Sequence, residues 1–443
     1  MRHPLLLLAA LPLCAQSPLS LKDAVRLAAE KHPSIEAGQS GVKAAELRIT
    51  EARAGHLPKL DYAESYLRSN NPVVVFSSLL TQHQFTTQNF EIGTLNRPNF
   101  INNFQSQVTV DQVVYDAGRT RQGVKSAELG RDLSAEQLRG NRIRVIANVV
   151  RTYHGAVLAA EALKVADEAA RSADADVNRA EAIRAAGMST DADVLSIRVH
   201  QAAMREQQIR RKADLEVASA ALNEALGQPL SEPHELTTAL TPVTADERPV
   251  EAYEKESVAS RPELRATRLA SSLAETQGAE VRGALLPQVT AHAGFEADRR
   301  RFVNQGGANW LASISLRWNL FNGGADKARI QEADYGLRRA HAMENEASAQ
   351  ARLEVRRAYA DFGAASRRIA VAQAAVTMAE ESLRITKNRF EAGLANVTDL
   401  LRTETALLDA RNRRLAAVYD QRMAAVNLEA AAGTLTESSQ VLD

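Results

Sequence analysis

The chain repeats itself at a fixed spacing, and this repeat limits its possible folds more than any other feature. The stretch "QVVYDAGRTRQGVKSAELG" at residues 112–130 returns as "WNLFNGGADKARIQEADYG" at residues 318–336. The same offset of 206 residues relates further pairs: Gly118 and Gly324, Tyr153 and Tyr359, Gly187 and Gly393, Asp193 and Asp399, Gly227 and Gly433. A duplication of this length predicts two similar structural units related by pseudo-symmetry.

Upstream of this region the offset becomes 229, since Pro33 matches Pro262 and Pro58 matches Pro287. The first copy therefore carries 23 extra residues between Pro58 and Val114. The extra stretch is rich in Asn, Gln, Ser and Thr, which predicts a long surface loop around residues 72–103.

Four segments alternate apolar and polar side chains with a period of two, which predicts strands. The predicted strands cover about residues 58–68, 104–115, 285–297 and 310–321. Trp310 and Trp318 fall on one face about 26 Å apart, which suits the aromatic girdles of a membrane β-barrel. A soluble sheet with one wet face would show the same alternation.

Beyond each glycine turn the apolar period becomes helical, as in Ile369, Val376, Leu383 and Phe390. A seven-residue repeat predicts coiled-coil packing. Gly187 and Gly393 interrupt the pattern as helix-turn hinges. The predicted helices are 20–55, 117–186 and 188–226 in the first copy, and 255–283, 323–392 and 394–432 in the second.

Four strands are too few to close a transmembrane barrel, and open strand edges are not tolerated in lipid. Two long helical hairpins likewise bury only a stripe each. Several copies of the chain must therefore complete both parts together.

The domain plan follows from the repeat: residues 1–15 as a signal peptide, 16–227 and 255–443 as the repeats, and 228–254 as a linker. The leader has a basic start and a short apolar run, so it directs the mature chain out of the cytoplasm. Cys14, the only cysteine, is either lipidated after cleavage or removed with the leader.

Composition and motifs exclude several functions. The 54 basic and 54 acidic side chains balance, which argues against a nucleic-acid partner. The histidines are scattered without metal-ligand spacing, so we expect no enzyme, metal or cofactor.

The order and spacing of several motifs resemble the TolC family of outer-membrane efflux proteins over nearly the whole mature chain. These motifs are "VVYDAG" and "NLFNGG" before the long helices, and "AGMSTDADVL" and "AGLANVTDLL" at the helix turns. The resemblance implies a mainly α fold with a small transmembrane β part. It also implies a homotrimer with a 12-stranded β-barrel in outer-membrane lipid, continued by a periplasmic α-helical barrel.

The same resemblance implies an exit duct of a tripartite efflux or type I secretion system, docked to a periplasmic adaptor and an inner-membrane pump. It does not name the cargo. The alternative is a soluble periplasmic coiled-coil adaptor or scaffold, which explains the helices but not the four strands.

By this resemblance the turns after Gly187 and Gly393 form the periplasmic aperture, with Asp193 and Asp399 as a carboxylate ring that favours cations. The alternative is that these aspartates only cap helix N-termini. Arg402 stands three residues after Asp399, where pairing would weaken the ring. The remaining expected site residues are the strand–helix turn glycines, Gly118, Gly323 and Gly324.

Overall fold

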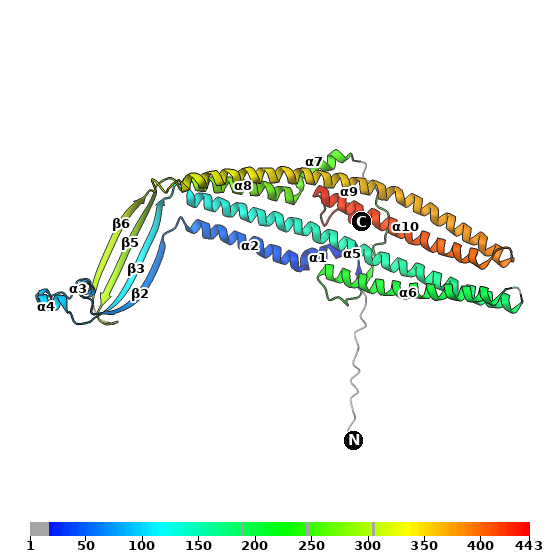
Figure 1. Ribbon diagram of the computed structural model, residues 1–443, viewed down its shortest axis with the longest axis horizontal. Helices are drawn as coiled ribbons and strands as arrows, with labels where there is room; N and C mark the ends of the chain where they lie inside the picture. Colours follow the sequence, from blue (N-terminus) through cyan, green and yellow to red (C-terminus); the bar gives the residue numbers. More distant parts are fainter. Residues whose placement is uncertain (1–16, 188, 245–247, 304–305) are drawn as a thin grey trace, which may run out of the picture. The chain divides into compact units, whose positions relative to one another are not determined.

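The computed structural model describes residues 17–187, 189–244, 248–303 and 306–443. The leader predicted over residues 1–15, Cys14 included, lies outside the described residues. The chain forms two compact units that we describe separately (Figure 1). One comprises residues 41–134 and 267–344 and contains a four-stranded sheet. The other comprises the described residues within 17–40, 135–266 and 345–443 and is mainly helical.

The sheet has the strand order β2-β3-β5-β6, and every neighbouring pair is antiparallel. The strands are β2 (Lys59–Ser69), β3 (Ile101–Tyr115), β5 (Gln288–Arg299) and β6 (Gly307–Arg317). Each repeat thus supplies one hairpin, and β3 and β5 join the two. β6 starts and ends a few residues before the predicted 310–321. It ends at Arg317 because its partner β5 begins at Gln288, which pairs with Arg317. The chain then turns through two left-handed glycines, Gly323 (φ 71°) and Gly324 (φ 87°).

The stretch expected to be a long surface loop contains helices, and this corrects the sequence expectation. Helix α3 (Pro72–Thr81) is followed by the short helices η1 (Thr87–Phe90) and α4 (Ile92–Asn96). Asn71 caps α3, since its side chain accepts from the amide of Val73 at 3.0 Å. The apolar run "VVVFSSLL" at residues 73–80 was the available signal, because it can pack a helix against the sheet.

A buried polar network fixes the end of α3 to the sheet. Gln82 Nε2 donates to Asn103 Oδ1 at 2.8 Å, and Asn103 Nδ2 donates to Asp298 Oδ1 at 2.5 Å. These three side chains are all buried, so each lost partner would leave a desolvated polar group. The segment from α3 to α4 is therefore an ordered cap on one end of the sheet (Figure 1).

In each repeat a long helix and a shorter return helix form a hairpin. The first pair is α5 (Arg119–Ala185) and α6 (Asp191–Leu226), and the second is α9 (Ala325–Glu391) and α10 (Val397–Ala432). Both long helices have 67 residues and both return helices have 36, so the duplication holds at the level of element lengths.

Each segment expected as one helix before the first strand of a repeat is broken in two, which corrects the predicted helices 20–55 and 255–283. The pieces are α1 (Leu21–Lys31) and α2 (Pro33–Ala54), then α7 (Val250–Ser260) and α8 (Pro262–Gly283). The breaks fall at His32 and Arg261, both in extended conformation, because each precedes a proline that disfavours helical backbone.

The C-terminal glycine of each return helix packs against one of these breaks. A Cβ on Gly227 would lie 3.2 Å from the Lys31 carbonyl oxygen, and one on Gly433 would lie 2.8 Å from Arg261 Cα. Both glycines are left-handed, which ends α6 and α10. The same contact, between the last glycine of a return helix and the break before a proline, therefore occurs once in each repeat. This contact explains why both Gly227 and Pro33 have counterparts in the second repeat.

The inter-repeat linker is partly ordered by a strand pair that the sequence did not predict. β1 (Ser17–Leu19) pairs in parallel with β4 (His234–Leu236). The buried hydroxyl of Tyr153 in α5 donates to the Leu19 carbonyl at 2.8 Å and accepts from the Thr238 amide at 2.9 Å. Tyr153 therefore ties the N-terminal strand and the linker to the main helical core.

Candidate functional site

The turns between the helices of each hairpin are built around left-handed glycines, Gly187 (φ 76°) and Gly393 (φ 70°). The amide of Gly187 donates to the Arg184 carbonyl at 2.8 Å, and that of Gly393 to the Phe390 carbonyl at 3.0 Å. No side chain clashes where a Cβ would be added at either glycine. Backbone conformation alone thus demands glycine at these turns.

One apolar cluster holds the two hairpins together beside their turns. It combines Val177 and Ala180 of α5, Val194 and Ile197 of α6, and Val397 of α10. Phe390 and Leu401 pack against it. The cluster brings the first turns of α6 and α10 to the same end of this unit, and with them Asp193 and Asp399.

Thr190 is the N-cap of α6, and Asp193 is the third helical residue of the same capping box. Its Oδ2 accepts from the amide of Thr190 at 3.0 Å and from the Thr190 hydroxyl at 2.7 Å, while its own amide donates back to that hydroxyl. These bonds from Thr190 hold the pKa of Asp193 below its usual value. The exposed carboxylate therefore remains ionised while it bonds to Thr190. Its role in the capping box is compatible with the charged role that the resemblance implies.

Asp399 stands at the matching position but has a different environment. Its amide donates to Asn396 Oδ1 at 2.8 Å, so Asn396 supplies the cap of α10. Within the described ranges, no hydrogen bond or ion pair involves the Asp399 carboxylate, which is exposed. The Asp399 carboxylate can therefore interact electrostatically with ions in solution.

Arg402 is also exposed, and the described residues contain no ion pair between it and Asp399. The pairing expected from their spacing is therefore not formed. Pairs of exposed side chains three residues apart gain only about 0.2–0.5 kcal/mol, which is comparable with the entropy lost by fixing both. An ion pair that does form at the first turn joins Arg184 to Asp191 at 3.0 Å.

The sheet of the other unit has one apolar and one polar face. A row across the apolar face consists of Tyr62, Val108, Phe295 and Trp310, which the strand register aligns. On the opposite face a neighbouring row holds Ala63, Gln107, Glu296 and Asn309. The period-two pattern is thus expressed as two chemically distinct faces.

Trp310 is 80% exposed and Trp318 55% exposed, so both predicted girdle residues present large apolar surfaces. Trp318 follows the last residue of β6, and its Nε1 donates to the Leu285 carbonyl at 3.0 Å.

Glu64, which breaks the apolar face of β2, finds its partners on the same face. Its Oε1 accepts from Arg299 Nη2 of β5 at 3.0 Å, and its Oε2 accepts from the Tyr62 hydroxyl at 2.8 Å and from Ser106. The charge is thereby neutralised locally, as an apolar setting requires.

The strand–helix turns contain the left-handed glycines that the motifs suggested: Gly118 (φ 83°), Gly323 and Gly324. In the first copy Asp116 orders the turn, since its carboxylate accepts from the amides of Gly118 at 3.0 Å and Thr120 at 2.7 Å. In the second copy Asn322 replaces it and accepts from the Asp326 amide at 3.3 Å.

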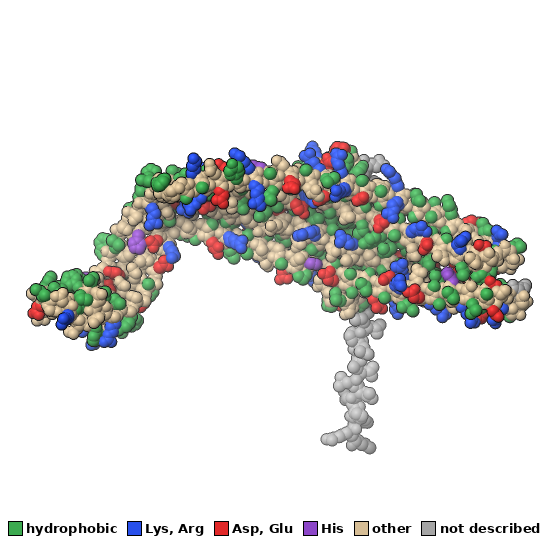
Figure 2. Space-filling model, viewed as in Figure 1, with side chains coloured by type: hydrophobic (Ala, Val, Ile, Leu, Met, Phe, Trp, Pro, Cys, Tyr) green, Lys and Arg blue, Asp and Glu red, His purple; other side chains and the backbone are tan. Residues whose placement is uncertain are grey.

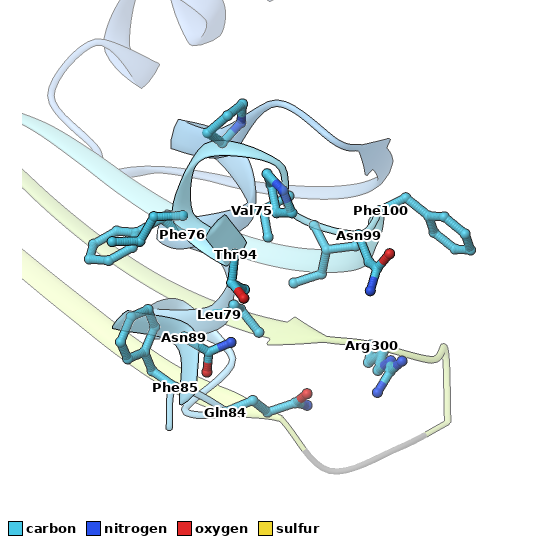
Figure 3. Close-up of a pocket in the computed structure, with 14 residues that line it drawn as sticks. Val75, Phe76, Leu79, Gln84, Phe85, Asn89, Thr94, Asn99, Phe100 and Arg300 are labelled. Carbon is cyan, nitrogen blue, oxygen red and sulfur yellow. The ribbon is translucent and has the colours of Figure 1, made fainter. Parts of the chain in front are cut away.

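The cap of the sheet contains a pocket of about 200 Å³ that no sequence pattern had indicated. Figure 3 shows Phe76 and Phe85 on one side of this pocket and Arg300 on the other. The cap also exposes apolar side chains, seen as a cluster in Figure 2, among them Val73 (74% exposed) and Ile92 (77% exposed).

Among the described residues, no helix is long and apolar enough to cross a membrane. The described residues also contain no cluster of His, Cys, Asp and Glu that would hold a metal ion.

A duplicated chain that joins a two-faced strand sheet to long helical hairpins has the architecture of a channel subunit. Residues 24–228 and 255–434 match the model of the outer membrane efflux protein family, and the chain belongs to that family. The matched ranges cover the two repeats and leave the linker between them.

Relatives with similar sequences span almost the whole chain. Protein CyaE of Bordetella pertussis is 27% identical over 429 residues, which cover 95% of this chain and 85% of CyaE. The alkaline protease secretion protein AprF of Pseudomonas aeruginosa is 26% identical over 435 residues, with the same coverage of 95% and 85%.

Solved structures show the same fold. CusC superposes with a TM-score of 0.80 at 17% identity, covering 94% of this chain and 93% of CusC. The CmeC outer membrane channel of Campylobacter jejuni also gives 0.80 at 17% identity, covering 100% of this chain and 95% of CmeC. The TolC-like fold expected from the motifs is thereby confirmed.

The protein is therefore an outer-membrane channel of the efflux protein family, with a periplasmic helical extension, and it is not an enzyme. The adaptor or scaffold alternative is rejected, because the family match includes the strands as well as the helices.

Proposed function

We propose that three copies of this chain form one continuous duct across the outer membrane and into the periplasm. The observation that carries the proposal is the open sheet: β2 and β6 each have a partner on one side only. Their outward backbone groups need partners, because lipid offers none.

Symmetry supplies those partners. The strands alternate in direction from β2 to β6, so β6 of one copy is antiparallel to β2 of the next. Two copies would give eight strands, and a barrel of that size is filled by its own side chains. Three copies give twelve strands and leave a lumen, which is the stoichiometry that a duct needs.

The two faces of the sheet fit this arrangement. The face with Trp310 and Phe295 meets lipid, while the row with Gln107, Glu296 and Asn309 lines the lumen. A polar lumen lets hydrated cargo pass without binding tightly.

At the other end of the duct, Asp193 and Asp399 of three copies contribute six carboxylates to the periplasmic entrance, and Gly187 and Gly393 form its turns. This ring attracts cations and resists anions. We further propose that a periplasmic adaptor docks on the helical hairpins and delivers cargo from an inner-membrane pump.

For the cargo we propose secreted polypeptides. The support is that AprF is named for alkaline protease secretion and that PrtF of Dickeya chrysanthemi, 24% identical over 438 residues, is named for proteases secretion. Deleting the gene should remove specific proteins from the culture medium while drug susceptibility stays unchanged. The opposite result would assign the duct to small-molecule efflux.

The duct itself is tested by native mass measurement of the detergent-purified protein together with carbonate washing of membranes. We expect three copies per particle, retained in the membrane pellet. A stable folded monomer released by carbonate would contradict the proposal.

A further inference from the structure

Four charged or ionisable side chains, one from each helix of the two hairpins, meet where the hairpins pack together. They are Asp176 of α5, His200 of α6, Lys387 of α9 and Glu404 of α10. The side chains of Asp176 and Glu404 are only 2% and 9% exposed. His200 lies seven residues after Asp193 on α6, and Glu404 lies five residues after Asp399 on α10, so the cluster is one to two helical turns from the turn aspartates. The proposed conduction of cargo makes no use of it.

The carboxylates in this cluster are incompletely satisfied. Lys387 Nζ is 3.2 Å from Asp176 Oδ1, and His200 Nε2 is 3.2 Å from Glu404 Oε2. The four carboxylate oxygens are closed to water, and none has a donor in full hydrogen-bond geometry among the described residues. The two carboxyl groups are close enough to shift each other's pKa. Buried carboxylates without donors are costly, so a further donor would be favoured here.

The charges around the two acids do not balance. Lys387 offsets one of the two carboxylates, and His200 adds positive charge only when it is protonated. Arg179, 3.6 Å from Asp176, is also bound to Glu391 at 2.9 Å, so it is already neutralised. With both acids ionised, the cluster therefore holds one negative charge in excess.

A cavity of about 280 Å³ opens directly beside this excess charge, with Glu404 and His200 in its wall. The rest of the lining is mainly apolar: Val165, Ala169, Met204, Leu383, Leu407 and Leu408. The charged groups on the remaining wall, Glu168 and Arg411, are paired with each other at 2.8 Å, and Arg411 also binds Glu380.

We propose that this cavity binds a lipophilic organic amine, whose ammonium group draws the Glu404 carboxylate to the cavity wall while its apolar body packs among the leucines. An ammonium supplies the missing donors and the missing positive charge together. The size also fits, since an apolar cavity of about 150 Å³ holds benzene, and this one has room for a two-ring body.

Protons compete with such a ligand. Burial, with Glu404 nearby, raises the pKa of Asp176 to about 6, whereas His200 and Lys387 help keep the pKa of Glu404 below its ordinary value. Below pH 6 Asp176 becomes neutral, and Lys387 then balances Glu404. Amine binding should therefore weaken as the pH falls.

Calorimetric titration of the purified trimer with 2-(2-naphthyl)ethylamine tests the proposal, with 2-(2-naphthyl)ethanol as the neutral probe. The amine should bind at pH 7.5 at least about tenfold more tightly than the alcohol, and at least about tenfold more tightly than at pH 5.0. Equal binding of the two probes, or no heat with the amine at millimolar concentration, would overturn the proposal.

Variants locate the site. Glu404→Gln and Asp176→Asn should each weaken the amine at pH 7.5 about tenfold or more, and Asp176→Asn should also remove the pH dependence. Met204→Trp leaves the charges in place but fills the cavity, so it should abolish binding of both probes. The control is Glu181→Gln, which removes the exposed Glu181–Arg198 pair at the repeat-related position. Unchanged binding in Met204→Trp, or equal loss in the control, would place the amine elsewhere and refute the site.

Discussion

Replacing Tyr153 by Phe removes one buried hydroxyl and tests how the N-terminal strand and the linker are held. Its bond to the Leu19 carbonyl at 2.8 Å is worth about 1 kcal/mol net. Loss of the second bond leaves the half-buried Thr238 amide without its acceptor, which costs up to about 1–3 kcal/mol. The free energy of local opening should therefore fall by about 2–4 kcal/mol, a factor of about 30–700 in the opening equilibrium.

Hydrogen exchange of peptides covering residues 17–21 and 234–240 measures this opening directly. The duplication provides the control, because Tyr359 is the repeat counterpart of Tyr153. Its ring packs 6.1 Å from that of Tyr253, but no hydrogen bond of its hydroxyl is found in the described parts of the chain. Tyr359→Phe should change the free energy of local opening, measured by exchange, by less than about 0.5 kcal/mol. Equal exchange in both variants, or no acceleration in Tyr153→Phe, would refute this account of the linker.

Three further predictions follow from the turns and the cap. Asp399→Ala should weaken block by divalent cations in planar bilayers without loss of stability, whereas Asp193→Ala should also destabilise α6 by about 1 kcal/mol because it loses the carboxylate bonds of the capping box to Thr190; identical behaviour would show that the two acids are equivalent. Arg402→Ala should strengthen the block because it removes a nearby positive charge, and an unchanged block would show that Arg402 does not weaken the field of the aspartates. Gly433→Ala should lower the free energy of unfolding more than Gly227→Ala, because its new Cβ meets backbone at 2.8 Å rather than 3.2 Å, and equal losses in denaturant titrations would mean that the helix breaks adjust freely. An epitope inserted after Thr87 should be reached by antibody on intact cells, and labelling only after permeabilisation would invert the topology.

Most of the fold could be predicted from the sequence, because its strands and helices are periodic and the chain is duplicated. Alternation located the four strands, the heptads located the hairpins, and the repeat offsets anticipated equal helix lengths. These signals are local, so they can be seen in one sequence.

The features that the sequence missed depend on contacts between distant residues. The breaks before Pro33 and Pro262 were visible as prolines, but the continuous helical pattern on either side concealed them. The β1–β4 pair involves three residues on each side, too few to form a pattern. The helical cap could not be predicted without knowing that Gln82 bonds to Asn103 and that Asn103 bonds to Asp298.

The role of the turn aspartates at an aperture stays a prediction, but the structure shows how their local environments differ. The spacing from each turn glycine identified Asp193 and Asp399 as equivalents. The N-cap residue decides how each acid behaves. Thr190 donates to the carboxylate of Asp193, whereas its counterpart Asn396 accepts only from the amide of Asp399. The cluster around Asp176 consists of side chains from four different helices, so no local sequence motif predicted it.

Cross-linking of the two open sheet edges tests the central claim that neighbouring copies complete the sheet. In a Cys14→Ser background, a cysteine at Ser65 of β2 is combined with a cysteine moved one position at a time along residues 307–317 of β6. Oxidation in membranes should link three copies covalently, but only for the β6 positions that lie opposite Ser65 and on the same face of the sheet. The reason is that a disulfide needs Cα atoms about 4.4–6.8 Å apart. Each cysteine alone should give none. A complete scan that yields no cross-link, or one that stops at two copies, would contradict the trimeric duct.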